Sequence, residues 1–187
     1  MNHLILINII ERMVGDYNLM ELITTIINSF HTESGKGLPL GNVTSQLFAN
    51  IYLNEFDQFV KHRLKVRYYI RYCDDFVIVG LSRFFLELLV ISIENFMRDN
   101  LDLRLHPRKV EIRKVTAGID FLGYVSLTHY AILRTKTKIR ILKKIRFLKS
   151  DFGKGKITEE SLKQSVQSYL GILRHCKGKK IEEKIID

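Results

Sequence analysis

The sequence predicts an α+β protein, in which helices cover one face of an antiparallel sheet and a small helical domain follows. Three observations favour this class: two apolar helical segments at the start, an aromatic and β-branched hairpin near residue 70, and basic helices at the end. At 187 residues the chain can bury one main core and a smaller appendage. Its 46% hydrophobic and 27% charged residues are typical of a soluble globular protein.

The individual elements follow from local periodicity. Apolar residues recur at helical spacing in several segments, which predicts helices over residues 4–14, 18–30, 46–64, 83–100, 136–149 and 159–174. Thr44 and Ser45 can cap the third of these helices, behind a loop that contains three glycines. Short apolar stretches predict strands over residues 101–105 and 110–115, and a β pair over residues 119–125 and 130–133.

The hairpin from Tyr68 to Val79 carries two adjacent acidic residues. Apolar side chains run through both arms, which predicts half-buried or fully buried strands with Asp74 and Asp75 at the tip of the turn. Carboxylates that close repel each other unless a cation holds both ionised, and Mg²⁺ prefers such hard oxygen ligands. The hairpin therefore indicates a divalent metal site, and an ordinary Asp-rich surface turn is the alternative.

The positive charge of the chain is concentrated at its end. The net charge is +10, and residues 134–187 contain 16 Lys/Arg against 6 Asp/Glu. This asymmetry indicates a phosphate-rich partner such as nucleic acid, with a solvated basic face as the alternative. The change in composition places a domain boundary near residue 133, giving domains over 1–133 and 134–187.

Several ordered motifs resemble those of reverse transcriptases. The box Tyr72-Cys-Asp-Asp75 resembles their Y-x-D-D catalytic box. Residues 37–46 resemble the loop and helix that touch the incoming nucleotide and template, and residues 103–109 resemble the strand that carries a lysine near the triphosphate. Residues 118–124 resemble the primer grip, and residues 168–175 are similar to a thumb helix of bacterial members.

The resemblance implies a palm over residues 1–133, a thumb over 134–187, and a role for each motif. Asp74 would bridge two Mg²⁺ ions and Asp75 would assist, while Lys109 would neutralise or protonate the leaving pyrophosphate. An ordinary strand-edge lysine is the alternative for Lys109. The other implied sites are nucleotide or template contacts at Gly41, Asn42, Ser45, Gln46 and Tyr72, a primer grip at Phe121, Leu122, Gly123 and Tyr124, and duplex backbone contacts at Lys136, Lys138, Arg140, Lys143 and Lys144.

The glycine motif indicates which group of reverse transcriptases the chain resembles. It ends in Ser45-Gln46, where most reverse transcriptases have Ser-Pro, and this variant resembles the enzymes of diversity-generating retroelements. Group II intron and retron enzymes are the near alternatives. The resemblance implies an RNA template, a DNA primer and deoxynucleoside triphosphates as partners, with a basic accessory protein or a separate N-terminal half as further candidates.

One catalytic part of the family pattern has no counterpart in the sequence. The family's first aspartate strand and its fingers precede the segment that matches residues 2–10, so we expect little or no polymerase activity from this chain alone. Two functions remain open: an RNA-directed DNA polymerase, or a non-catalytic palm–thumb module that binds nucleic acid or an accessory protein. The distant cysteines, Cys73 and Cys176, and the absence of a long apolar run favour a reduced, cytoplasmic protein with no membrane segment.

Overall fold

The computed structural model describes residues 1–38 and 43–186, and the chain forms two compact units, Met1–Ile112 and Arg113–Asp187. Each unit combines helices with a small antiparallel sheet, which confirms the predicted α+β class. The palm–thumb boundary predicted near residue 133 falls at the junction between a strand and a helix inside the second unit, and that domain assignment stays a prediction. None of the described helices is long and apolar enough to cross a membrane.

Two short helices open the first unit, as predicted. α1 (His3–Glu11) begins where the Asn2 side chain accepts hydrogen bonds from the first turn, and α2 (Tyr17–Asn28) is capped in the same way by Asp16. Leu6 and Ile27, one on each helix, are completely buried. The caps fix where the helices start, and the apolar faces fix how they pack.

The long helix α3 (Val43–Gln58) continues into a π-helical turn, Phe59–Arg63. Its predicted start at Gln46 is wrong, because Thr44 and Ser45 already lie inside the first turn of the helix. Thr and Ser carry only a modest helical penalty, and the packing of an apolar face overrides it. That face contains Phe48, Tyr52 and Phe56, all buried as the periodicity indicates.

The central hairpin consists of β1 (Tyr68–Tyr72) and β2 (Asp75–Val79), which pair in antiparallel register. The two-residue turn is Cys73-Asp74 rather than Asp74-Asp75, because Asp75 already pairs with Tyr72. Burial alternates along β1, so that Tyr69 and Arg71 lie on the packed face while Tyr68 and Tyr72 are exposed. The expectation that both arms are half or fully buried is therefore wrong for one face of the hairpin.

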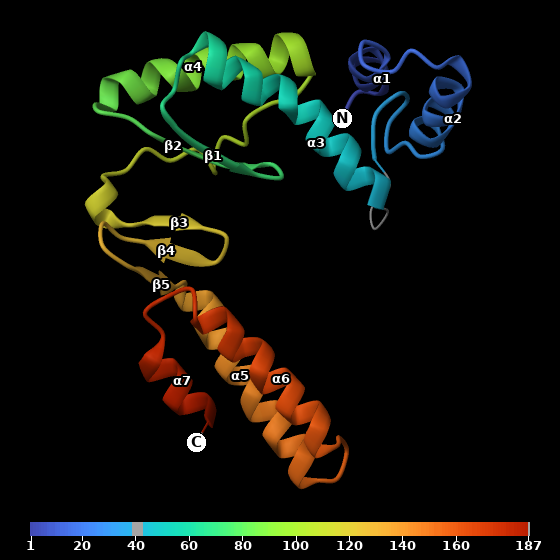
Figure 1. The fold of residues 1–187 in the computed structure, drawn as a ribbon. Helices are drawn as coiled ribbons and strands as arrows, with labels where there is room; N and C mark the ends of the chain where they lie inside the picture. Colours follow the sequence, from blue (N-terminus) through green and yellow to red (C-terminus); the bar gives the residue numbers. More distant parts are fainter. Residues whose placement is uncertain (39–42, 187) are drawn as a thin grey trace. The chain divides into compact units, whose positions relative to one another are not determined.

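The packed face of the hairpin rests on α3 and α4 (Arg83–Leu101), which Figure 1 draws in teal and light green. The ring of Phe56 meets Tyr69 and Phe76 edge-on, with centroid separations of 5.9 and 4.9 Å. The hydroxyl of buried Tyr52 donates to the carbonyl of Leu101 at 2.5 Å, which joins α3 to the end of α4. Aromatic packing from α3 thus fixes the hairpin on the core of this unit.

No regular strand follows α4 in residues 102–114, so the strands predicted over 101–105 and 110–115 are wrong. α4 continues to Leu101, and Asp102 ends it with a left-handed backbone. Leu103 and Leu105 pack on the core as the alternation indicates, but this segment forms no ladder with any described strand. Apolar alternation reports burial, whereas a strand also needs a neighbour to pair with.

The second unit contains a three-stranded sheet, β3 (Ile119–Phe121), β4 (Tyr124–Ser126) and β5 (Ala131–Leu133), in that order. The predicted two-part β pair is therefore three strands, because the positive φ angles of Leu122 (52°) and Gly123 (87°) fold residues 119–125 back on themselves. The predicted basic helices are α5 (Thr135–Gly153) and α6 (Glu159–Leu173), which pack side by side. A further helix, α7 (Lys179–Ile186), was not predicted and buries Ile181 and Ile185 against them.

Candidate functional site

Two exposed carboxylates lie at the end of the first-unit hairpin. Asp74 occupies the turn, and Asp75 opens β2 opposite Tyr72. In the described part of the chain neither carboxylate takes part in an ion pair or a side-chain hydrogen bond. Both can therefore accept a ligand without breaking an existing contact.

Next to this turn, Arg71 links the hairpin to α3. Its Nε and Nη2 donate to the two carboxylate oxygens of Asp57 at 2.8 and 2.6 Å, which is a bidentate ion pair. The remaining Nη1 donates to the Cys73 carbonyl at 2.7 Å and to Asn50 Oδ1 at 3.3 Å. The Tyr69 hydroxyl also donates to Asp57, at 2.5 Å.

These contacts change the ionisation of Asp57. Burial raises the pKa of this carboxyl, but hydrogen bonds from Arg71 and Tyr69 outweigh that effect, and the net pKa lies below the ordinary 3.8. The carboxylate is therefore charged and fully engaged by Arg71 and Tyr69. It is not free to serve as a ligand for a metal at the turn.

The depressed pKa predicts how stability depends on pH. A carboxyl whose pKa is lower in the folded than in the unfolded state stabilises the fold above the unfolded value and loses that contribution as the pH falls through the folded value. We therefore expect the free energy of unfolding to fall below pH 3.8 more steeply in the wild type than in Asp57→Asn. Urea unfolding between about pH 2 and about pH 6 measures this, and parallel curves for the two proteins would contradict it.

The nucleotide-contact residues predicted on α3 are only partly described. Gly41 and Asn42 lie outside the described residues, while Ser45 is half-buried and Gln46 exposed in the first turn of α3. Gln46 precedes Asn50 by four residues, so both lie on the same side of the helix. Because Asn50 contacts Arg71 beside the acidic turn, Gln46 lies one helical turn beyond that contact.

Lys109 lies in a turn rather than on a strand. Its backbone N–H donates to the carbonyl of His106 at 2.8 Å, and its side chain is exposed. In the described residues no contact joins this lysine to the acidic turn. The structure therefore leaves its predicted role toward pyrophosphate as a prediction.

The predicted primer-grip residues form the β3–β4 turn of the second unit. Phe121 pairs with Tyr124, and Leu122 and Gly123 form the turn between them, with Leu122 exposed. The Tyr124 hydroxyl donates to the carbonyl of Ile172 at 3.0 Å, which fastens this hairpin to α6. The hairpin is thus fastened to α6, while Leu122 at its tip is exposed.

α5 carries the cationic residues predicted to contact a nucleic-acid backbone. Ile141 and Ile145 bury one side of the helix, and the opposite side is exposed. The predicted contacts are all on this helix, with Lys138 half-buried and the others exposed: Lys136, Lys138, Arg140, Lys143 and Lys144. Two apolar side chains, Ile139 and Phe147, are also exposed on it, so its solvent face combines positive charge with apolar contact area.

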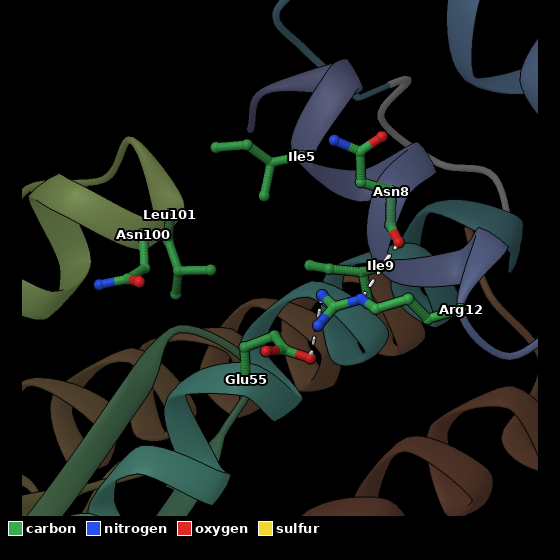
Figure 2. Close-up of a pocket in the computed structure, with 7 residues that line it drawn as sticks. All are labelled: Ile5, Asn8, Ile9, Arg12, Glu55, Asn100 and Leu101. Carbon is green, nitrogen blue, oxygen red and sulfur yellow. Dashed lines mark hydrogen bonds and ion pairs between the residues drawn. The ribbon is translucent and has the colours of Figure 1, made fainter.

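A shallow hollow lies where α1 meets α3 and α4, and Figure 2 shows the residues that line it. Arg12 forms an ion pair with Glu55 across it at 3.6 Å and donates from Nε to the carbonyl of Asn8. The charged groups of this hollow satisfy each other. It is therefore a packing feature of the first unit and a weaker candidate site than the acidic turn.

The donor chemistry of the acidic turn suits a hard divalent cation. Asp74 and Asp75 offer two adjacent carboxylates, and neither forms an ion pair with a described side chain. Among residues 1–38 and 43–186 no group of three or more His, Cys, Asp or Glu side chains is placed to hold a metal ion. The turn is therefore a partial ligand set that water and phosphate oxygens could complete.

The contacts among Asp57, Arg71, Tyr69 and Asn50 were missed by sequence reasoning. One signal was present: Tyr69 and Arg71 are two apart in a strand, so they share a face next to a helix that carries an acidic residue. The pairing itself joins residues 14 apart in sequence and depends on how α3 packs.

Comparison with known proteins assigns the family. The family described as "Reverse transcriptase (RNA-dependent DNA polymerase)" matches residues 3–126. Protein YkfC of Escherichia coli is 29% identical over 161 residues, which cover 66% of this chain and 42% of YkfC. The putative COX1/OXI3 intron 2 protein of Saccharomyces cerevisiae is 22% identical over 186 residues, covering 65% of this chain and 22% of that protein. The chain spans less than half the length of either relative, and the match over residues 3–126 shows that it belongs to the reverse transcriptase family.

Proposed function

We propose that the chain is the palm and thumb part of an RNA-directed DNA polymerase, and that Asp74 and Asp75 hold its catalytic metal. The observation that carries this proposal is the exposed carboxylate pair at the turn of a hairpin, which forms no ion pair with the described residues and lies in the Y-x-D-D box of a reverse transcriptase family member. The activity, the substrates and the partners are parts of the proposal, because the relatives are much longer than this chain.

The proposed reaction joins the 3′ hydroxyl of a primer to the α-phosphate of a deoxynucleotide and releases pyrophosphate. When bound, Mg²⁺ supplies charge stabilisation for the attacking and leaving oxygens. Asp74 and Asp75 supply the negative charge that retains the cation next to the substrate phosphates. Tyr72 lies opposite Asp75 with an exposed ring, so it can pack against the primer end or the new base pair.

The second unit would hold the duplex. Exposed cations on α5 can contact phosphates in any sequence, and the β3–β4 turn, fastened to α6 by Tyr124, can support the primer strand through Leu122. Ile139 and Phe147 would supply apolar contact with sugars between the charged positions. This arrangement supports binding to a hybrid of RNA and DNA with little dependence on sequence.

Neutralising the exposed α5 cations should weaken hybrid binding. In a triple variant with Lys136→Gln, Arg140→Gln and Lys143→Gln, each lost phosphate contact should reduce the salt-dependence slope of log K by about 0.9. A matched control with Lys154→Gln, Lys156→Gln and Lys163→Gln removes the same charge from other exposed positions. Fluorescence anisotropy across a salt series measures the slope, and an equal change in both variants would contradict a specific role for α5.

The proposal also includes the class of retroelement to which the chain belongs. Gln46 in place of the usual proline supports an enzyme of a diversity-generating retroelement, and its position one turn beyond Asn50 places it on the side of α3 that carries the Arg71 contact. The yeast relative is an intron protein by name, so the group II intron alternative stays open.

A second candidate is a palm–thumb module that binds nucleic acid without synthesis. It is favoured by the limited ligand set, because in the described residues only Asp74 and Asp75 gather at the turn. Primer extension on an RNA template with Mg²⁺, in the wild type and in Asp74→Asn, tests the proposal. Synthesis that depends on Asp74, even at the low level expected of this chain alone, supports the polymerase, whereas hybrid binding with neither synthesis nor metal binding at Asp74 supports the module.

A further inference from the structure

The guanidinium of Arg71 holds the backbone of the acidic turn as well as the Asp57 side chain. Its side chain is only 11% exposed, and its Nη1 donates to the carbonyl of Cys73, the residue directly before Asp74. The same nitrogen contacts Asn50 on α3. One side chain therefore connects the helix, the strand and the turn.

The turn needs such a contact. Cys73 has a φ angle of 52°, a left-handed conformation that residues with a Cβ adopt rarely, and its side chain is exposed and supplies no anchor. In the described residues, the carboxylates of Asp74 and Asp75 are likewise engaged by no other side chain. The hydrogen bond from Arg71 to the Cys73 carbonyl is therefore a principal restraint on the tip.

Arginine is suited to this task by its geometry. Its planar fork can bind both oxygens of Asp57 while the third nitrogen reaches the carbonyl, which a lysine ammonium cannot reproduce. Asp57 in turn is fixed on α3 and receives the Tyr69 hydroxyl. The orientation of the guanidinium is thus determined before any ligand reaches the turn.

We infer that Arg71 is a positioning residue, which fixes the Cys73 carbonyl, and with it the turn that presents Asp74, by anchoring on Asp57. The inference rests on the proposed function only for the identity of the ligand that the turn presents. If Arg71 only joined β1 to α3, replacing it would destabilise the fold, but the tip of the turn would stay ordered.

The test uses Arg71→Lys in the full chain, with two measurements. Lysine keeps the positive charge beside Asp57 but cannot hold Asp57 bidentately and the Cys73 carbonyl together. We expect the backbone order parameter of the Asp74 amide to fall from about 0.85 to below about 0.6. We also expect Mn²⁺, the probe for the metal site in electron paramagnetic resonance titrations, to bind about tenfold more weakly.

Tyr69→Phe is the matched control, because it removes one hydrogen bond to Asp57 without touching the contact with the Cys73 carbonyl. It should keep the wild-type order parameter and Mn²⁺ affinity, even where its thermal stability falls as much as that of Arg71→Lys. A tip that stays ordered in Arg71→Lys, or one that loosens equally in Tyr69→Phe, would overturn the inference.

Two further outcomes distinguish a failure of the proposed metal site from a failure of the positioning role. If wild-type protein binds no Mn²⁺ at Asp74, the proposed metal site fails, and the order parameters alone still decide the positioning role. If Arg71→Lys does not fold, Asp57→Asn serves as the second variant. It keeps an oxygen that can accept hydrogen bonds from Arg71 and Tyr69, but it removes the negative charge that orients the guanidinium. A loosened Asp74 amide in that variant supports the inference, and a fully ordered one overturns it.

Discussion

Asp74→Asn is expected to abolish any Mg²⁺-dependent DNA synthesis, which we expect to be weak or absent in this chain alone, while leaving the fold and hybrid binding unchanged. The side chain is exposed and, in the described residues, has no partner, so its replacement by an isosteric amide removes a charge and no packing. An amide is a poor ligand for a catalytic cation, and losing several kcal/mol of transition-state stabilisation slows the reaction by about a thousandfold or more. Primer extension on an RNA template measures the rate, and Mn²⁺ titration measures the site directly.

Asp99→Asn is a suitable control for that change. It removes the same charge from another exposed position, near the end of α4 and remote in sequence from the turn. Both variants should bind the hybrid with wild-type affinity and salt dependence. If Asp74→Asn retained Mn²⁺ affinity, or if it lost hybrid binding as fully as metal binding, the role assigned to Asp74 would be wrong.

Phe56→Ala is expected to lower the free energy of unfolding by about 3–5 kcal/mol. Phe56 is completely buried in α3, and its ring packs edge-on against Tyr69 and Phe76 of the hairpin. Truncation removes apolar burial and two aromatic contacts, and it leaves a cavity that the hairpin cannot close without moving. Urea unfolding followed by circular dichroism measures the loss.

Phe84→Ala is the matched control on α4, since it removes the same side chain from a position that is 70% exposed. Its expected effect lies within about 0.5 kcal/mol of zero. Because the Phe56 ring supports the strand that carries Arg71, the folded fraction of Phe56→Ala should also bind Mn²⁺ more weakly. Equal stability of the two variants would show that the hairpin does not depend on α3.

The predicted helices agree with the structure because amphipathic periodicity is a local property. The spacing of Leu6 and Ile9, or of Ile141 and Ile145, lies within a few turns of one helix, and each such pair is buried. The hairpin was predicted for the same reason, since its strands are adjacent in sequence. α7 was missed because its eight residues offer little more than two turns of pattern.

The errors arose where a local pattern was compatible with more than one tertiary environment. Residues 101–105 alternate like a strand, yet Leu101 completes α4, and Leu103 and Leu105 pack on the core without a ladder. The sequence likewise does not distinguish the buried face of β1 from the exposed one, because Tyr68, Ile70 and Tyr72 are as apolar as a core face. In both cases the packing of the neighbouring elements decides whether a segment pairs as a strand and which of its faces is buried.

Residues close together in the chain were enough to predict the family motifs, the concentration of charge at the end of the chain, the helices and the acidic hairpin. The three-dimensional arrangement was needed to show that the turn is Cys73-Asp74, that one face of the hairpin is exposed, and that Asp57 is bound by Arg71. These features depend on how α3 packs against the hairpin. A side chain's partners are set by that packing, which local periodicity does not encode.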